Sequence, residues 1–323
     1  MTIFITGATG FIGSHLVNHL SRTGHRLVCL ARPTSDRKIL EESGATIVFG
    51  DVTDRSATRE VMQGCQWVVH LASTFEFWVT DKRVYRAVNV DGTRTLMENA
   101  LEAGVTKVIH VSTAAVYGNA EWPISEETPF GLSCASMYAQ TKREGDALVW
   151  KMYRERGLPV VGIMPGAVLG PNDPKAAGRY VANFARGKMP AQVLTRRVFP
   201  FVHVRDVCGA IVLALELEST VGEKYLIVGQ NMTFGELNKM ISDIAGAKLP
   251  LVKLPDWLSV FNSYLFTALA DLTGGCPLWD MSVDQIALMK MGGEFDGSKA
   301  TRQLGLTYTP IRLALEEAIA SLG

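Results

Sequence analysis

Three glycines follow the first predicted strand, Thr2–Thr6, and lead directly into a helical pattern. They are Gly7, Gly10 and Gly13, spaced as GxxGxxG in the segment TGATGFIG. Gly7 permits a tight turn, Gly10 lets a ligand approach the backbone, and Gly13 allows close packing of helix on strand. The start of the helix would present free N–H groups and its positive dipole end to phosphates. This arrangement predicts a dinucleotide site with contacts from Gly7, Thr9, Gly10, Phe11, Ile12 and Gly13.

Short apolar runs alternate with longer helical patterns through the first half of the chain. The expected strands are Thr2–Thr6, Arg26–Ala31, Thr46–Phe49, Trp67–Leu71, Lys107–Ser112 and Val160–Met164. The expected helices are Phe11–Thr23, Arg55–Gln63, Val84–Ala103 and Met137–Arg156. Nearly continuous apolar strands separated by helices favour a parallel sheet that is covered on both faces. The predicted fold class is therefore α/β, with a doubly wound parallel sheet.

After Pro165 the alternation loosens into a stretch rich in proline and glycine. We expect residues 1–165 to form the main domain, to which 199–230 returns with two strands and a helix. Residues 166–198 and 231–323 would form a smaller, mostly helical C-terminal substrate lobe. Its large apolar side chains would wall an apolar pocket or, equally well, form an ordinary helical core: Trp257, Phe261, Tyr264, Leu265, Phe266, Leu278 and Trp279.

Charge and cysteine content exclude several classes of protein. Lys plus Arg and Asp plus Glu both number 32, so nothing in the charge balance favours nucleic-acid binding. Five scattered cysteines without a CxxC pair predict reduced thiols, no metal site and a cytoplasmic location. Because the sequence starts with a predicted strand and has no basic segment before it, no signal peptide is expected. The apolar stretch 258–272 is too short to span a bilayer, so no integral membrane segment is expected. For this stretch, burial beside a substrate is favoured over contact with a membrane.

The residues that follow the second and third strands indicate which dinucleotide is bound. An acidic residue after the second strand would bind the ribose 2′-hydroxyl of NAD, but this chain has Arg32 there. A guanidinium pairs with a 2′-phosphate, which predicts NADP(H), with NAD(H) as the alternative. Asp51 and Val52 follow the third strand and are expected cofactor contacts. Asp51 is placed to accept a hydrogen bond from the adenine amino group or, alternatively, to cap the loop.

Tyr138 and Lys142 are four residues apart in an amphipathic helical pattern, so both lie on one helix face. A phenol is a poor acid–base group at neutral pH, and a neighbouring ammonium would lower its pKa. Thr113 follows a predicted strand, at the sheet edge where ligands bind, and is expected to orient a substrate carbonyl. Ser112 is the competitor for that role. The predicted catalytic residues are Thr113, Tyr138 and Lys142.

Eight segments occur in a characteristic order: TGATGFIG, GDVTD (50–54), HLAS (70–73), NVDGT (89–93), VSTAAVYG (111–118), YAQTK (138–142), MPGAVLGP (164–171) and FVHVRDV (201–207). With them the chain resembles the extended short-chain dehydrogenases/reductases of the NAD-dependent epimerase/dehydratase superfamily. The resemblance implies a Rossmann-type sheet, with Thr113 as substrate hydroxyl, Tyr138 as general acid/base and Lys142 as its partner. It also implies a homodimer paired through the helices near 91–103 and 138–156.

Further contacts follow from the same resemblance. The cofactor would also be bound by Leu71, Ala72, Ser73, Val111, Pro165 and Val168. Asn89 is expected to be structural or part of a proton-relay water network. The loop from Thr74 to Trp78 should overhang the nicotinamide. The expected substrate contacts are Thr74, Phe75, Phe77, Tyr117 and Gly166.

Three departures from the family pattern favour redox chemistry on a carbonyl. Dehydratases carry acidic residues just after the catalytic hydroxyl, where this chain has Ala114 and Ala115. Nucleotide-sugar epimerases tend to have an arginine where Phe199 stands, although two arginines closely precede it. The run beginning at Arg32 resembles the branch that contains dihydroflavonol reductases, cinnamoyl-CoA reductases and 3β-hydroxysteroid dehydrogenases.

The sequence therefore predicts an NADP(H)-dependent oxidoreductase that acts on a ketone, secondary alcohol or aldehyde of a largely apolar small molecule. One alternative is a nucleotide-sugar 4-epimerase that keeps its cofactor tightly bound. The other is a non-catalytic NADP(H)-sensing protein.

Overall fold

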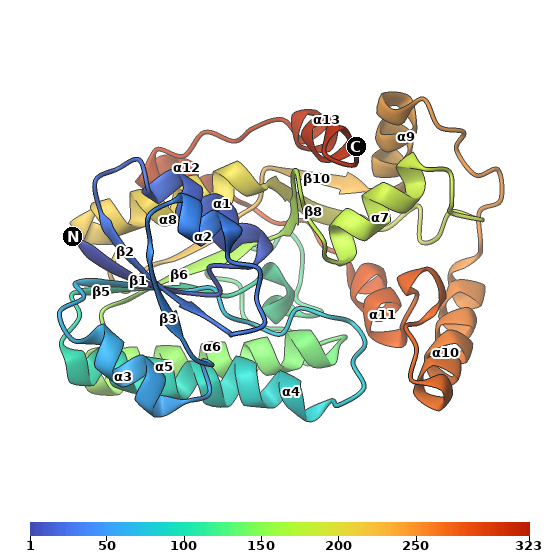
Figure 1. Ribbon diagram of the computed structural model, residues 1–323. Coiled ribbons are helices and arrows are strands. Elements are labelled where there is room, and N and C mark those ends of the chain that lie inside the picture. Colours follow the sequence, from blue (N-terminus) through green and yellow to red (C-terminus); the bar gives the residue numbers. More distant parts are fainter.

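The structure is a computed structural model that describes all 323 residues. Its centre is a seven-stranded parallel sheet in the order β3-β2-β1-β4-β5-β6-β9 (Figure 1). The strands are β1 (Thr2–Thr6), β2 (Arg26–Ala31), β3 (Thr46–Phe49), β4 (Trp67–His70), β5 (Lys107–Val111), β6 (Val160–Pro165) and β9 (Lys224–Ile227). The strand order reverses between β1 and β4, where α/β sheets bind ligands at their carboxyl edge.

Helices cover both faces of this sheet, as Figure 1 shows. One layer contains α1 (Phe11–Leu20), α8 (Val204–Glu216) and α12 (Ser298–Leu304), and the other contains α3 (Arg55–Met62), α5 (Thr93–Ala103) and α6 (Met137–Arg156). Along β1, Ile3 and Ile5 pack into the first layer whereas Phe4 packs into the second. Alternate side chains of a strand point to opposite faces, so a strand buried on both faces must be apolar throughout. The predicted fold class, a Rossmann-type doubly wound sheet, is confirmed.

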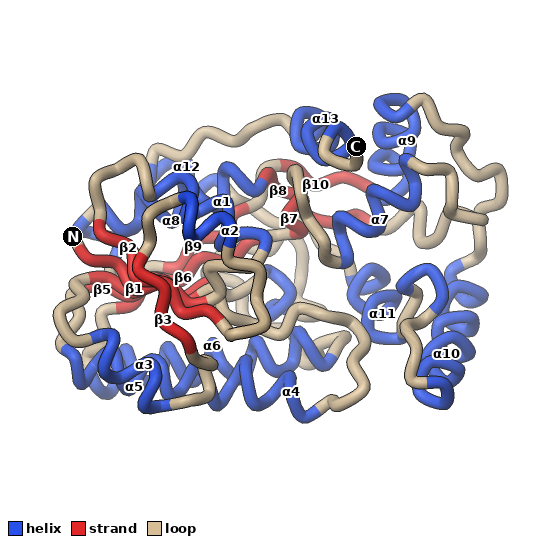
Figure 2. The backbone as a smooth tube through the Cα atoms, in the orientation of Figure 1, coloured by secondary structure: helices blue, strands red, loops and turns tan.

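A second, smaller sheet has the order β10-β8-β7 and consists of β7 (Ala167–Leu169), β8 (Val198–His203) and β10 (Gln230–Thr233). Around it lie α7 (Ala176–Ala185), α9 (Phe234–Ala245), α10 (Asp256–Thr273), α11 (Val283–Met291) and α13 (Ile311–Ala320). We call these elements the small lobe; Figure 2 shows it beside the large sheet. Of the segment 199–230, α8 and β9 join the large sheet and its helices, whereas β8 pairs within the small one. The division of the chain into domains stays a prediction.

The helix expected over 84–103 is interrupted. It consists of α4 (Arg83–Arg86), a π-helical segment (Ala87–Gly92) and α5. A π segment adds a residue to the turn and is a common device at functional sites. By contrast, α6 has the predicted bounds because both of its ends carry strong local signals. Ser136 Oγ accepts from the Ala139 N–H at the start, and Gly157 ends the helix with a φ of 70°.

A short helix, α2 (Lys38–Glu42), links β2 to β3, and single 3₁₀ turns cover Ala114–Tyr117, Glu218–Thr220 and Leu278–Asp280. No helix in the structure combines the length and the apolar character needed to cross a membrane.

Candidate active site

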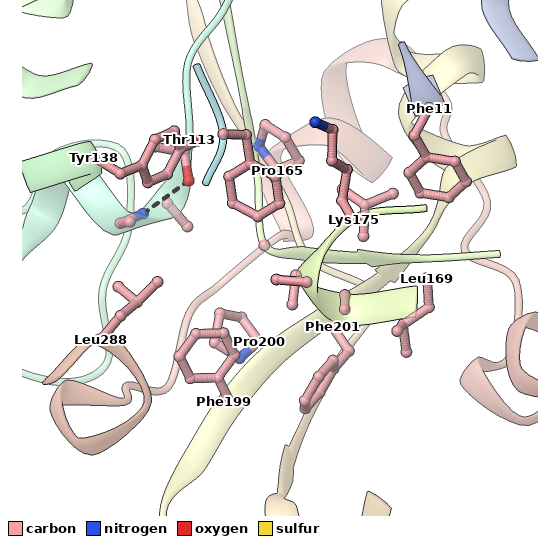
Figure 3. A pocket seen from close by; sticks show the side chains of 18 of the residues that line it. Phe11, Thr113, Tyr138, Pro165, Leu169, Lys175, Phe199, Pro200, Phe201 and Leu288 are labelled. Atoms are coloured by element: carbon pink, nitrogen blue, oxygen red, sulfur yellow. Dashed lines mark hydrogen bonds between the residues drawn. The ribbon is translucent and has the colours of Figure 1, made fainter. Parts of the chain in front are cut away.

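A cavity of about 270 Å³ runs from the glycine turn, past the carboxyl ends of β4, β5 and β6, to the small lobe. Figure 3 shows Phe11 at one part of it, Thr113 and Tyr138 at another, and Phe199, Pro200 and Leu288 beyond. Residues predicted from widely separated motifs therefore meet in one place. Those that line the cavity are Gly7, Gly10, Phe11, Ile12, Gly13, Leu71, Ser73, Phe75, Phe77, Val111, Thr113, Tyr138, Lys142, Pro165, Gly166 and Val168.

The glycine turn fits a dinucleotide because its backbone leaves no room for side chains. Gly7 has a φ of 71°, and a Cβ there would lie 2.6 Å from the Ala72 backbone nitrogen. A Cβ on Gly13 would lie 2.1 Å from the Gly7 carbonyl oxygen, so helix α1 is held tightly against the turn. Gly10 is the N-cap of α1 and has no side chain to satisfy the first N–H groups. Those groups are therefore free to bind phosphate oxygens.

Arg32, Asp51 and Val52 lie outside this cavity, after β2 and β3, where an adenosine would extend from the turn. The Arg32 side chain is exposed and makes no hydrogen bond or ion pair with the protein. Asp51 Oδ1 accepts from the backbone N–H and the hydroxyl of Thr53, at 3.0 and 2.8 Å. Asp51 thus caps its own loop, which is the alternative that the sequence left open.

Thr113, Tyr138 and Lys142 come together at the end of β5. Thr113 is the N-cap of the 3₁₀ turn Ala114–Tyr117, and its Oγ1 accepts from the Ala115 N–H at 3.2 Å. The Tyr138 ring packs edge-on against Phe75 and Phe77, with centroid distances of 5.0 and 6.2 Å. Phe75 and Phe77 come from the loop that was predicted to overhang the site. This packing holds the Tyr138 side chain next to Thr113, and both line the cavity.

The electrostatics keep the Tyr138 phenol protonated. Burial raises the pKa of Tyr138 to about 12, although the neighbouring Thr113 hydroxyl acts in the opposite direction. The sequence analysis expected the Lys142 ammonium to lower this pKa, and here burial outweighs any such effect. Lys142 Nζ donates to the Val111 carbonyl oxygen at 2.9 Å. Burial lowers the pKa of Lys142 to about 8, while Asp146, one turn further along α6, acts to raise it.

Asn89 ties the overhanging loop to helix α6. Its Oδ1 accepts from the Ser73 hydroxyl at 3.0 Å and from the Thr74 N–H at 2.9 Å. Its Nδ2 donates to Thr141 Oγ1 at 3.0 Å. Since Thr141 lies in α6 between Tyr138 and Lys142, Asn89 fixes the loop and the helix relative to each other. This geometry supports a structural role.

Two groups of predicted substrate contacts lie elsewhere. Tyr117 is fully buried against Phe130 and Phe295, because the 3₁₀ turn after Thr113 directs its ring away from the cavity. Thr74 makes backbone bonds to Asn89 and does not line the cavity. None of the aromatic and aliphatic residues proposed for a pocket wall in the C-terminal lobe lines it either. Trp257, Phe261, Tyr264, Leu265, Leu278 and Trp279 are exposed on the surface instead.

The apolar wall of the cavity comes from strand β8 and helix α11. Phe199, Phe201, Leu288 and Met289 line it, together with Phe295. The sequence singled out Phe199 only as a departure from an arginine. The residues of α11 carry no local signal, because an apolar helix position predicts burial but not what it faces.

Comparison with known proteins places this chain among relatives of known fold. The family model described as "NAD dependent epimerase/dehydratase family" matches residues 3–228. The chain is 31% identical to sterol demethylase protein B of Methylococcus capsulatus, over 99% of this chain and 98% of that protein. It is 29% identical to a putative dihydroflavonol 4-reductase of Synechocystis sp., over 98% of this chain and 93% of that protein.

Two solved structures are similar along their whole length. The crystal structure of gox2253 has a TM-score of 0.86 and 36% identity, over 99% of this chain and 97% of that chain. DesIV, a dTDP-glucose 4,6-dehydratase from Streptomyces venezuelae solved with NAD and TYD bound, has a TM-score of 0.80 and 26% identity, over 99% and 96%.

Fold, glycine turn and cleft together define an oxidoreductase that uses a nicotinamide dinucleotide. The match of the family model over more than half of the chain identifies its family. The chain belongs to the NAD-dependent epimerase/dehydratase family, and within it to the extended short-chain dehydrogenases/reductases.

Proposed function

We propose that the protein is an NADP(H)-dependent oxidoreductase that interconverts a ketone or aldehyde and its alcohol in a largely apolar substrate. The observation that carries this proposal is the position of Tyr138. Its protonated phenol lies beside Thr113 in a cavity whose far wall is formed by Phe199, Phe201 and Leu288. A neutral phenol and a hydroxyl that converge on an apolar cavity suit a carbonyl oxygen.

In the reduction, Thr113 and Tyr138 would each donate a hydrogen bond to the substrate carbonyl oxygen. As negative charge develops on that oxygen, Tyr138 transfers its proton to it. Bound NADPH would supply the hydride. Lys142 would hold the nicotinamide ribose and, as a buried ammonium with a pKa of about 8, help to restore the Tyr138 proton.

The preference for NADP(H) rests on Arg32. Its guanidinium is exposed, unpaired and positioned at the end of β2. A 2′-phosphate would give it a charge-assisted partner, and the position directly after β2, where a carboxylate would accept from a 2′-hydroxyl, is occupied by Arg32 itself.

The cavity lining argues against the nucleotide-sugar alternatives. Ala114 and Ala115 line it where a dehydratase would need an acidic base. The only carboxylate that lines it, Asp173, already accepts from the backbone N–H groups of Lys175 and Gly178. No arginine lines the cavity to grip a sugar diphosphate, and Arg197 is paired with Asp256 at 2.7 Å. A 4-epimerase would instead be purified with its dinucleotide bound and would need none added.

Replacing Tyr138 by Phe tests the proposal. Turnover of a panel of apolar ketones, followed by loss of NADPH absorbance, should fall by roughly 10²–10⁴-fold. NADPH binding, measured by fluorescence titration, should stay nearly intact. Tyr153→Phe is the matched control because it lies in the same helix, α6, and does not line the cavity. Unchanged turnover in Tyr138→Phe would remove the phenol from the chemistry, and NADPH binding without turnover of any carbonyl would favour a sensing protein.

The same proposal includes a cytoplasmic homodimer. The helices that would pair are α5 and α6, which lie side by side on one face of the large sheet (Figure 1). Light scattering coupled to size-exclusion chromatography gives the mass in solution, and a monomer would contradict the dimer.

A further inference from the structure

Helix α10 displays most of its large apolar side chains, although Val260 and Phe266 pack against the core of the small lobe. Its fully buried positions include two small polar residues, Ser259 and Ser263, whose hydroxyls donate to backbone carbonyls of their own helix. Its outward positions carry large apolar side chains that are between 47% and 85% exposed: Trp257, Phe261, Tyr264, Leu265, Leu269 and Leu272. A surface helix normally buries its apolar stripe. This helix displays it.

The exposed surface continues beyond the helix. Leu251 and Val252 precede α10 and are 98% and 55% exposed, and Leu278 and Trp279 follow it. Figures 1 and 2 show α10 at the far end of the small lobe, with α11 as its neighbour. We call these ten residues the α10 face. Exposed apolar side chains gathered on one helix and its flanking segments are typical of an interaction site.

The charges around the α10 face favour a negatively charged partner. No charged residue occurs between Asp256 and Asp271. Both carboxylates are engaged, Asp256 with Arg197 at 2.7 Å and Asp271 with Trp78 Nε1 at 2.8 Å and Lys82 at 3.9 Å. Lys248 and Lys253, which flank the exposed Leu251 and Val252, are themselves exposed and have no acidic partner. Unpaired lysines beside exposed aromatic and leucine side chains are typical of helices that lie in a lipid–water interface.

A second cavity lies under the same helix. Its volume is about 330 Å³, and Tyr264, Thr267, Ala268 and Asp271 of α10 form one wall. Phe77 lines both this cavity and the candidate active site, where its ring packs against Tyr138. Phe77 therefore borders both the space beneath α10 and the cavity that holds Tyr138.

We propose that the α10 face docks this protein onto the surface of a lipid bilayer that contains anionic lipid. The helix lies in the interface with its apolar side chains among the acyl chains, and Lys248 and Lys253 contact the headgroups. An apolar carbonyl compound dissolved in the bilayer then enters beneath α10 and reaches Tyr138 past Phe77; this last step rests on the function proposed above. A protein partner on the same face would cover that cavity, whereas a fluid bilayer supplies the compound to it.

Vesicle flotation tests the docking without any reference to activity. The purified full-length protein is mixed with vesicles of phosphatidylcholine alone, or of phosphatidylcholine with phosphatidylglycerol, and centrifuged through a density gradient. The protein should float with the mixed vesicles and much less with phosphatidylcholine alone. The variant Phe261→Ser/Leu265→Ser should lower the partition coefficient by at least about tenfold, because two inserted side chains are lost. The control Leu132→Ser/Leu313→Ser removes two exposed leucines from other surfaces and should float like the wild type.

Charge reversal supplies a second variant. Lys248→Glu/Lys253→Glu should abolish the preference for phosphatidylglycerol. The α10 face could instead bind a second copy of this chain. Sedimentation velocity of the wild type and of Phe261→Ser/Leu265→Ser measures that self-association. The proposal is overturned if the wild type does not float, or if Phe261→Ser/Leu265→Ser floats as well as the wild type. If the wild type does not float but self-associates, and Phe261→Ser/Leu265→Ser is monomeric, the α10 face is an interface between two copies of this chain.

The proposed membrane docking and the proposed reaction can be disproved independently of each other. Protein that floats but reduces no carbonyl leaves the docking intact and overturns the proposed reaction. Protein that reduces a water-soluble ketone but never floats does the reverse. Phe261→Ser/Leu265→Ser should keep turnover of the soluble ketone, and lose turnover of a long-chain ketone presented in mixed vesicles by about the factor seen in flotation.

Discussion

The proposed preference for NADP(H) depends on Arg32, and the surroundings of this residue make the test simple. Because its guanidinium has no partner in the protein, replacing it removes no internal contact. Arg32→Asp should weaken NADPH through repulsion of the 2′-phosphate and improve NADH through a bond to the 2′-hydroxyl. We expect the ratio of kcat/KM for NADPH over NADH to fall by about 10²-fold, equivalent to about 3 kcal/mol.

A neighbouring arginine provides the control for that substitution. Arg37 lies in the same loop but is held over the Phe49 ring and near Glu41. Arg37→Asp changes the charge of this surface by the same amount, so it separates a general electrostatic effect from a contact with the 2′-phosphate. If both variants shifted the ratio equally, Arg32 would not be the residue that recognises the phosphate.

Burial of the charged Lys142 side chain lowers the free energy of unfolding at neutral pH. Its pKa falls from 10.5 to about 8 in the folded protein, a penalty of about 3 kcal/mol for the buried ammonium at neutral pH. Between pH 8 and 10.5 the unfolded chain keeps a proton that the folded chain has lost. Since the unfolded state then binds more protons, wild-type stability rises with pH across this window.

The variant Lys142→Met removes this titration. At neutral pH its free energy of unfolding should exceed that of the wild type by up to about 2 kcal/mol, because the buried charge is removed. The gain stays below about 3 kcal/mol because the Val111 carbonyl oxygen loses its hydrogen-bond donor. The difference should shrink as pH rises towards 10.5. Urea unfolding at both ends of the window measures it. A difference that grows with pH would mean that Lys142 is not a strained buried cation.

Local spacing explains why the sequence could predict that Thr113, Tyr138 and Lys142 lie together. Tyr138 and Lys142 are related by the helix repeat, and Thr113 by its position at a strand end, so each pattern lies within a few residues. The pKa of Tyr138 was not predictable, because it depends on Phe75 and Phe77 packing over it from another segment. Tyr117 was misplaced because a 3₁₀ turn breaks the alternation of a strand.

At the scale of elements, the strands of the large sheet were predicted closely because a strand buried on both faces is almost continuously apolar, whereas β7 and β10 of the small sheet were not expected. The helix expected over 84–103 was not predicted with its interruption, because the π segment packs against α6, which is distant in the sequence. Gly145 of α6 lies against that segment: a Cβ there would be 2.3 Å from the Asn89 carbonyl oxygen. The glycine therefore lets α6 approach the segment that carries Asn89.

This contact predicts the effect of Gly145→Ala. Alanine gains about 1 kcal/mol in helix propensity, but the overlap with a backbone oxygen costs more, so we expect a net loss of about 1–2 kcal/mol. Displacing α6 should also lower turnover, because Tyr138 and Lys142 move with it. Urea unfolding and steady-state kinetics measure the two effects.

Gly209 in the middle of α8 is the matched control. A Cβ there would meet only the Leu306 side chain, at an ordinary 3.5 Å. Gly209→Ala should therefore stabilise the protein by up to about 1 kcal/mol and leave turnover unchanged. If Gly145→Ala were also stabilising, the π segment would not depend on this close approach.

Helix α10 shows the limit of reading elements from hydrophobicity. Its apolar residues were expected to be buried, and the sequence pattern does not distinguish a helix that faces a core from one that faces outward. Only the placement of α11 on one side of α10, with Ser259 and Ser263 at buried positions, decides the question.

At the scale of the whole molecule, the cavity lies between the large sheet and the small lobe, and one cluster of charges bridges the two. Glu76, on the loop after β4, is 2.6 Å from Lys175 Nζ and 3.6 Å from Arg179. Arg179 also pairs with Asp280 at 3.0 Å. These side chains are partly exposed, so the cluster contributes on the order of 1 kcal/mol or less. That is enough to change how often the loop covers Tyr138.

Glu76→Gln should therefore raise the KM for the carbonyl substrate by about two- to fivefold, with a smaller change in kcat, because it weakens closure and leaves the catalytic residues in place. Added salt should raise the wild-type KM in the same direction, since it screens partly exposed pairs, and should leave the variant nearly unaffected. Glu155→Gln removes a comparable charge from α6, away from the cavity, and should behave like the wild type. Steady-state kinetics at low and high ionic strength distinguish the outcomes. An equal salt response in the wild type and in Glu76→Gln would mean that this cluster does not hold the loop over the site.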